Sequence, residues 1–103
     1  MIQLSVKDRI YLPTILLKNY DLVDGQTKRH IEEKIEFSEQ EIEALNFNRK
    51  SGSVTWDATA SQDIEVEFTF AQMDFMKHSV KLLSQQHQIN DEIFSLCERI
   101  DSV

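Results

Sequence analysis

The side chains of this sequence that are best suited to catalysis or metal binding are its histidines and its cysteine. His30, His78 and His87 show no i, i+4 spacing to one another, and no cysteine or carboxylate stands at a zinc-like interval on the same predicted element. Cys97 lies in an apolar segment beside the acidic Glu98, and acidic neighbours raise rather than lower the pKa of a thiol. The sequence therefore predicts no metal site, no cofactor and no catalytic thiol.

Nucleophile and phosphate-binding motifs are also absent from the sequence. His78 is followed by Ser79, but this pair has no nucleophile elbow and no supporting motif around it. The chain has 2 glycines, too few for a glycine-rich phosphate loop. We interpret His30 and His78 as solvated side chains and His87 as a partly buried residue at a helix end. The sequence favours a protein that is not an enzyme, with a small hydrolase or metal-dependent enzyme as the weaker alternative.

Glutamates form the other group of candidate functional residues. Asp and Glu outnumber Lys and Arg by 18 to 11, and the net charge of −7 disfavours direct binding to nucleic acid. The glutamates after residue 31 are explained either as a solvated helix surface or as a negative patch that binds a basic surface of a protein partner. The candidate partner-binding residues are Glu32, Glu36, Glu39, Glu41, Glu43, Glu65 and Glu67.

Length and composition predict a single domain over residues 1–103 with one hydrophobic core. The single cysteine cannot form an internal disulfide, and the first residues lack the apolar run of a signal peptide. No apolar run is long enough to span a bilayer. We therefore expect a cytoplasmic protein that does not bind membranes.

The first element that would position these residues is a helix near the N-terminus. Ser5 and Asp8 have the spacing of a capping box, and we expect one kinked helix over residues 5–18. Pro13 lies inside it and would cause the kink, because proline removes a backbone donor and clashes with the preceding turn. Residues 2–6 alternate between apolar and polar types, so the same pattern also allows a short strand.

Two further helices are expected in the acidic part of the chain. Asp24 can cap a helix over residues 25–36. Ser38 and Glu41 form the clearest capping box in the sequence and predict a short helix over residues 39–45.

After this helix the hydrophobic period changes to two, which is typical of strands. Residues 47–49 and 54–56 flank a Ser51-Gly52 turn and predict a β-hairpin. Residues 63–70 give the clearest strand. Its apolar face consists of Ile64, Val66, Phe68 and Phe70, and its polar face includes Glu65 and Glu67. We expect these segments to form a three-stranded antiparallel meander.

The segment 70–86 is the predicted central packing element. Its main apolar stripe consists of Met73, Met76, Val80 and Leu83. Because apolar residues cover about half of this helix, more than one neighbour must pack on it. A last helix over residues 91–100 follows, capped by Asn90. The fold class is therefore α+β, with a small three-stranded antiparallel β-meander packed against helices on both sides of it in the sequence.

Four features carry a resemblance to known proteins. They are residues 4–10 with the Leu16-Leu17 pair, the capping box at 37–42, the segment 52–56, and a closing pair of helices joined by a polar turn. In these features the chain resembles an uncharacterised family of small bacteriophage and prophage proteins. Pro13 departs from that family, which has an uninterrupted helix there. The resemblance implies a phage-encoded accessory or virion-associated protein in the host cytoplasm, without assigned catalytic residues.

Residues and resemblance together predict a non-enzymatic protein-interaction module that acts through an acidic surface or an exposed sheet edge. The expected partner is a protein with a basic surface, and a homo-oligomer fits as well. An alternative function is inhibition of a nucleic-acid-binding host defence protein by acidic mimicry. A nucleic-acid binder would need a continuous basic strip, for which the candidates are Lys7, Arg9, Lys18 and Arg49. An enzyme would need a pocket where a histidine meets carboxylates.

Overall fold

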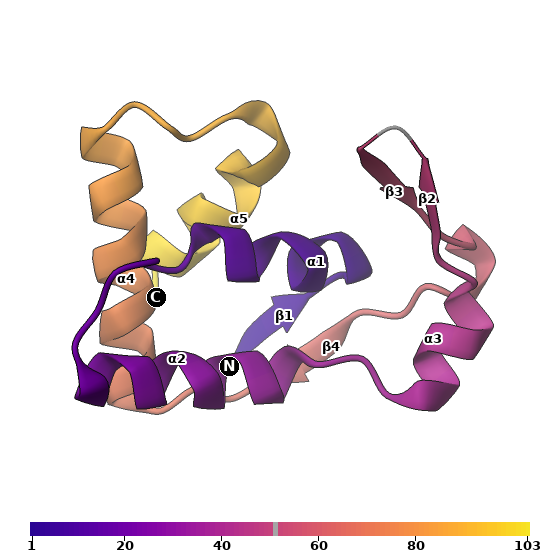
Figure 1. Ribbon diagram of the computed structural model, residues 1–103, viewed down its shortest axis with the longest axis horizontal. Helices are drawn as coiled ribbons and strands as arrows, with labels where there is room; N and C mark the ends of the chain where they lie inside the picture. The colour runs from indigo at the N-terminus through magenta and orange to yellow at the C-terminus, as the bar shows by residue number, and fades with distance from the viewer. Residues whose placement is uncertain (51) are drawn as a thin grey trace.

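The structure is a computed structural model that describes residues 1–50 and 52–103. Within these residues, five α-helices and two small antiparallel sheets confirm the α+β class. The elements are β1 (Ile2–Leu4), α1 (Val6–Ile15), α2 (Leu22–Ile35), α3 (Glu39–Leu45), β2 (Asn48–Lys50), β3 (Ser53–Thr55), the short 3₁₀ helix η1 (Ala58–Ala60), β4 (Ile64–Val66), α4 (Phe70–Gln85) and α5 (Asp91–Asp101). Ser51, part of the predicted hairpin turn, lies outside the described residues. In Figure 1, α3 and β2–β3 lie apart from α4 and α5, at the opposite end of the molecule.

The predicted three-stranded meander is wrong, because the chain forms two separate two-stranded sheets. The hairpin prediction is confirmed: β2 pairs with β3. Both hairpin strands are exposed apart from the half-buried Val54, so the hairpin offers no continuous apolar face to which β4 could add. β4 pairs instead with β1, and this pairing places Ile2, Leu4 and Val66 together in the core. The alternation in residues 2–6 therefore marks a strand, followed directly by a helix.

β4 is shorter than the predicted strand 63–70, because the start of α4 interrupts it. Thr69 caps α4, and its hydroxyl accepts from the backbone N–H of Gln72. Phe70 is therefore the first helical residue, and it is 84% exposed instead of lying on the apolar strand face. A local capping box has replaced the last part of the strand pattern.

The helix boundaries follow the capping residues. The Ser5–Asp8 capping box starts α1 as predicted, but α1 ends at Ile15, earlier than residue 18. Asp21 caps α2 in place of Asp24, so α2 starts three residues earlier than predicted. α3 has the predicted bounds and its predicted capping box, and α5 starts after Asn90 as predicted.

α4 is the central packing element, since it packs against α1, α2 and α5. Met76 and Val80 of its predicted stripe are buried, whereas Met73 and Leu83 are only half-buried. Two polar residues take part in the buried face. One of them, Ser79, accepts a hydrogen bond from the backbone N–H of Leu17 at 3.2 Å and donates one to the Phe75 carbonyl at 2.9 Å.

One apolar cluster joins β1, β4, α1, α2, α4 and α5, and we call these elements the core. Its buried members are Ile2, Leu4, Leu12, Ile15, Leu16, Ile31, Ile35, Val66, Phe75, Met76, Val80, Ile93, Leu96, Cys97 and Ile100. In the part of the chain that is described, no helix is both long enough and apolar enough to cross a membrane.

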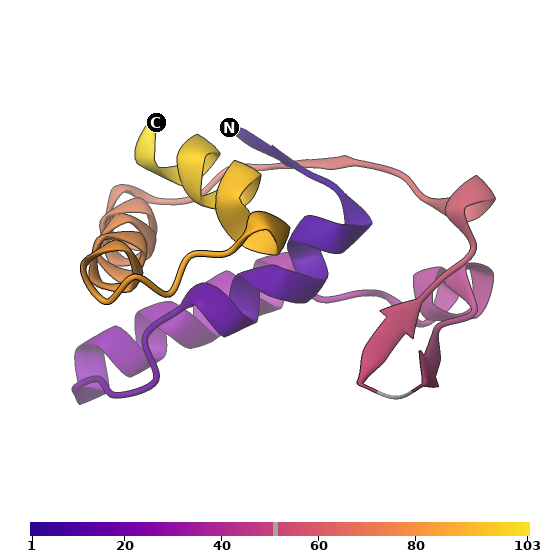
Figure 2. The ribbon, with the colours of Figure 1, turned by 90° about the horizontal axis from the view of Figure 1, so that it is seen from above.

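The remaining elements form an arm, which we define as residues 37–50 and 52–60. Figure 2 shows the arm projecting beyond the end of α1 that begins at Val6. Its one fully buried apolar residue is Leu45 of α3, and three aromatic rings of the arm pack against one another. The rings of Phe37 and Phe47 are 5.2 Å apart at 67°, and those of Phe47 and Trp56 are 6.4 Å apart at 62°. Such edge-on contacts stabilise a small cluster but bury far less surface than the core does.

Candidate interaction surface

Arg9 fixes the acidic segment to the core. Its side chain lies on the inner face of α1, and the residue is 4% exposed. Its Nε donates to the carbonyl of Ile35 at 3.1 Å, and its Nη2 donates to the carbonyl of Glu36 at 2.9 Å, both at the C-terminal end of α2. Nη1 and Nη2 also donate to the two carboxylate oxygens of Glu41 on α3, at 2.6 and 3.2 Å. One guanidinium therefore sets the position of α3 relative to the end of α2.

Glu41 is tied into the fold by these contacts. Its Oε1 also accepts from the backbone N–H of Ser38 at 3.0 Å, which completes the capping box of α3. The Arg9 guanidinium lowers the pKa of Glu41 from 4.5 to about 2, so the carboxylate is ionised in neutral solution. The same guanidinium lies 4.0 Å from the ring centroid of Phe37, a cation–π contact. We call this set of contacts around Arg9 the clasp.

Four of the predicted partner-binding glutamates lie on exposed positions of the two segments that the clasp joins. Glu32 and Glu36 are one turn apart at the end of α2, and Glu39 and Glu43 are one turn apart on α3. We call these four residues the acidic ridge. The ion pairs formed by the described residues join Lys7 to Glu92, Arg9 to Glu41 and Arg99 to Asp8, so the ridge carboxylates carry no intramolecular counterion.

Lys34, the basic residue nearest the ridge in sequence, points its ammonium elsewhere. Its Nζ donates to the carbonyl of Glu67 at 2.8 Å and to Oε1 of Gln72 at 2.7 Å. This contact places the end of β4 beside α2, with the Glu67 side chain exposed. Glu65 is also exposed and lies opposite Gln3 in the β1–β4 sheet. The two strand glutamates therefore form a second acidic position, separate from the ridge.

The histidines do not meet in one place. His78 lines an open groove of about 1200 Å³ along α4, whose lining also includes Asp74, Glu98 and Asp101. Within residues 1–50 and 52–103, no hydrogen bond joins His78 to a carboxylate, and no three metal-binding side chains cluster. His30 is exposed on α2.

The last histidine and the cysteine differ in burial. The prediction that His87 is partly buried is wrong: it is exposed just beyond α4, where φ is +54° and the chain turns out of the helix. Cys97 is buried as predicted, and this burial raises the pKa of its thiol. A neutral, buried thiol is a poor nucleophile.

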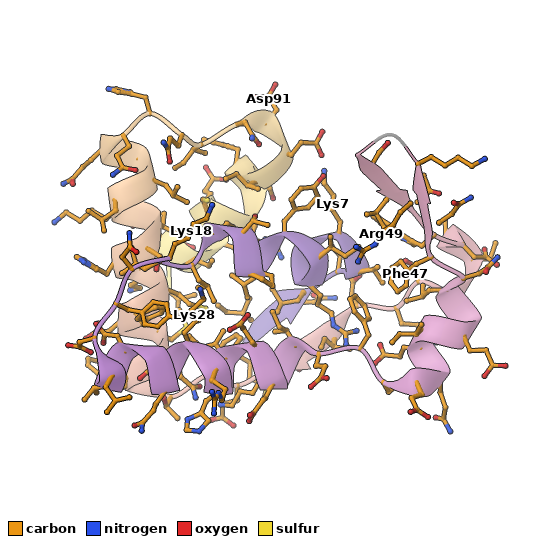
Figure 3. All side chains as sticks on the ribbon, viewed as in Figure 1. Lys7, Lys18, Lys28, Phe47, Arg49 and Asp91 are labelled. Carbon is orange, nitrogen blue, oxygen red and sulfur yellow. The ribbon has the colours of Figure 1, made fainter. Side chains whose placement is uncertain are left out.

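The candidate basic strip does not form from its four predicted members. Arg9 is inside the clasp, and Lys7 forms an ion pair with Glu92 at 3.1 Å. Lys18 and Arg49 lie at opposite ends of α1, as Figure 3 shows. These positive charges are therefore neutralised or separated.

Sequence reasoning missed the role of Arg9. A signal was present, because Val6, Arg9 and Leu12 recur every three residues and so share the inner face of α1. A cation on such a face needs an acidic or carbonyl partner, and the partners proved to be Glu41 and the end of α2. The sequence alone did not show that these groups lie next to α1.

No protein-family model, curated protein or solved structure matches the chain. The resemblance to small phage proteins therefore stays a prediction. Function has to be inferred from the exposure, charge and fixed placement of the surface residues themselves.

Proposed function

We propose that this protein is a non-enzymatic interaction module whose acidic ridge binds a basic surface on a protein partner. The observation that carries the proposal is the exposure of the four ridge carboxylates on α2, its C-cap and α3, which the clasp joins, with no ion pair to any residue that the structure describes. Charges held on helices attract an oppositely charged surface over a distance and lose little conformational freedom when it docks.

Glu41 has a supporting part in this proposal. Both of its carboxylate oxygens accept hydrogen bonds from Arg9, so it orients α3 and does not itself meet the partner. In this proposal the partner contacts Glu39 and Glu43, the ridge residues two positions before and after Glu41 in the chain.

The phage resemblance suggests a context for this module, as an accessory or virion-associated protein. Acidic mimicry of nucleic acid is the alternative within the same function, and it uses the same ridge. The two differ in one measurable respect: under mimicry, nucleic acid competes with the protein for the partner, whereas an assembly partner is insensitive to nucleic acid.

The test compares three forms of the protein in affinity capture from host lysate, followed by direct binding of the captured partner. The ridge variant carries Glu32→Lys, Glu36→Lys, Glu39→Lys and Glu43→Lys. The control variant carries the same charge change at four exposed acids outside the ridge: Asp74→Lys, Asp91→Lys, Glu98→Lys and Asp101→Lys. Since the changed side chains are exposed, both variants should keep the circular dichroism of the parent.

We expect the ridge variant to bind the partner at least about ten-fold more weakly than the control variant, because four exposed ion pairs of a few tenths of a kcal/mol or more are lost. Binding of the parent should also weaken as salt is raised. Equal affinity of the ridge and control variants for every captured protein would reject the ridge as the binding surface.

A further inference from the structure

The β1–β4 sheet has two outer edges, and a side chain from α5 bonds to one of them. On the β1 side, Nη1 of Arg99 from α5 donates to the carbonyl of Gln3 at 2.6 Å. Nη2 of the same side chain donates to Asp8 at 2.7 Å and holds the guanidinium in place. The outward carbonyl of β1 is therefore already bonded.

The direction of the Gln3 carbonyl establishes the hydrogen-bond pattern of the sheet. The backbone N–H of Ser5 donates to Asp8 at 2.9 Å, so it is not part of the ladder with β4. Since bonded and non-bonded pairs alternate along an antiparallel ladder, Ile2–Val66 and Leu4–Ile64 are the bonded pairs, and Gln3–Glu65 is the non-bonded pair.

It follows that the backbone N–H and C=O of Glu65 point away from β1. Among the described residues, neither group forms a backbone hydrogen bond outside the ladder, and the residue is exposed. Just after the C-terminal end of β4, the ammonium of Lys34 donates a hydrogen bond to the carbonyl of Glu67. The open part of the edge is therefore centred on Glu65, where a further strand can pair.

The negative charges along this edge determine which kind of strand can pair with it. Asp63, Glu65 and Glu67 are exposed at every second position of the extended segment, which places them on one face. A second copy of the chain paired antiparallel through this edge would set Glu65 opposite Glu65, and like charges directly opposite one another destabilise a sheet. A strand with Lys or Arg at every second residue has the complementary charge.

We propose that the outer edge of β4 binds an extended segment of another protein that carries Lys or Arg at alternate positions, and that this segment becomes the third strand of the sheet. The proposal goes beyond the acidic ridge: it uses a different surface, main-chain hydrogen bonds, and a partner segment of defined conformation.

Glu65→Pro tests the main-chain part of the proposal. Because the N–H of Glu65 points outward, proline removes the donor offered to the partner while the β1–β4 bonds remain. Glu65→Thr is the matched control, which removes the charge but keeps the N–H. The probe is a fluorescent peptide of about six residues, an ordinary strand length, with alternating lysine and valine.

We expect Glu65→Thr to weaken peptide binding about two- to five-fold, through the lost cross-strand charge pair. Glu65→Pro should weaken it about ten-fold more than Glu65→Thr, through the lost backbone bond. In the unchanged protein, saturating peptide should slow hydrogen exchange of the Glu65 amide at least about ten-fold, a measurement that does not depend on how well the proline variant folds.

Equal affinity of the proline and threonine variants, or unchanged exchange of the Glu65 amide at saturation, would overturn the proposal. The ridge variant in the same assay separates this inference from the proposed function. If the ridge variant retains both peptide binding and Glu65 protection, the edge is an independent site. If the ridge variant loses the peptide and Glu65→Pro keeps it, the peptide binds the ridge, and the edge proposal is rejected.

Discussion

The core and the arm of this protein are held in place by different forces. The core joins six elements through a continuous cluster of buried apolar side chains. The arm has Leu45 as its one fully buried apolar residue, a small set of aromatic contacts, and the clasp. Burial of apolar surface in the core is spread over many residues, whereas one guanidinium supplies the polar attachment of the arm.

This difference determines how each region responds to mutation. Loss of one core side chain should affect every core element, because the packed cluster is cooperative. Loss of Arg9 should free the arm and leave the core folded. The single tryptophan, Trp56, lies in the arm, so its fluorescence reports on the arm while the helical circular dichroism reports mainly on the core.

The largest expected effect is that of Met76→Ala, at a core residue with 0% exposure. The substitution leaves a cavity among four packed helices, and we expect a loss of about 3–4 kcal/mol in the free energy of unfolding. Denaturant titration should show the circular dichroism transition shifting to lower denaturant, with the tryptophan transition shifting at least as far. A shift in the tryptophan signal alone would contradict the division into core and arm.

Arg9→Met should have a somewhat smaller effect that is confined to the arm. The substitution keeps an apolar stem on α1 but removes the guanidinium from Glu41 and leaves two carbonyls at the end of α2 without their donor, at a cost of about 2–3 kcal/mol. We expect Trp56 fluorescence to change at lower denaturant than the helical signal, and amides of α3 to exchange faster. Coincident transitions in this variant would show that the arm does not depend on the clasp.

Glu41→Gln should have the smallest effect, and that effect should depend on pH. The carboxylate has a pKa of about 2 in the fold and 4.5 as its ordinary value, so the stability that it contributes is fully present above about pH 4.5 and is lost as the pH falls toward 2. Since the carboxylate is partly exposed, we expect a loss of about 1–2 kcal/mol at neutral pH.

The measurement for Glu41→Gln is the tryptophan transition at a series of pH values. Between pH 4.5 and pH 2 the parent should approach the stability of the variant, and above that range the difference between them should be constant. A difference that stayed the same down to pH 2 would show that Glu41 acts without its charge.

The features that the sequence predicted well are those set by neighbouring residues. The Ser38–Glu41 capping box determines the start of its short helix, and Asn90 determines the start of α5. The start of α2 was misplaced because Asp21 and Asp24 are both capable caps, and the fold uses the first. The local sequence thus allows either aspartate to cap the helix, and the packing of the folded chain determines which one does.

The features that sequence reasoning missed depend on contacts between distant segments. The partner of β4 could not be identified, because its apolar alternation fits β1 as well as the hairpin. The sequence offers Arg9 only as a candidate for the basic strip, because its partners lie 26, 27 and 32 residues away in the chain. The candidate acidic residues lie on exposed positions, except for Glu41, which is half-buried and engaged by the clasp.

The pairing of β1 with β4 has a consequence for how the chain folds as it is synthesised. The Gln3–Asp63 contact spans 60 residues, and the Arg99–Gln3 contact that closes the other edge spans 96. Ile2 and Leu4 are synthesised well before Ile64 and Val66, the residues with which they pair. Contacts of such long range are slow to form, so the completed sheet should appear late in folding, and until then the apolar side chains of β1 lack their strand partner.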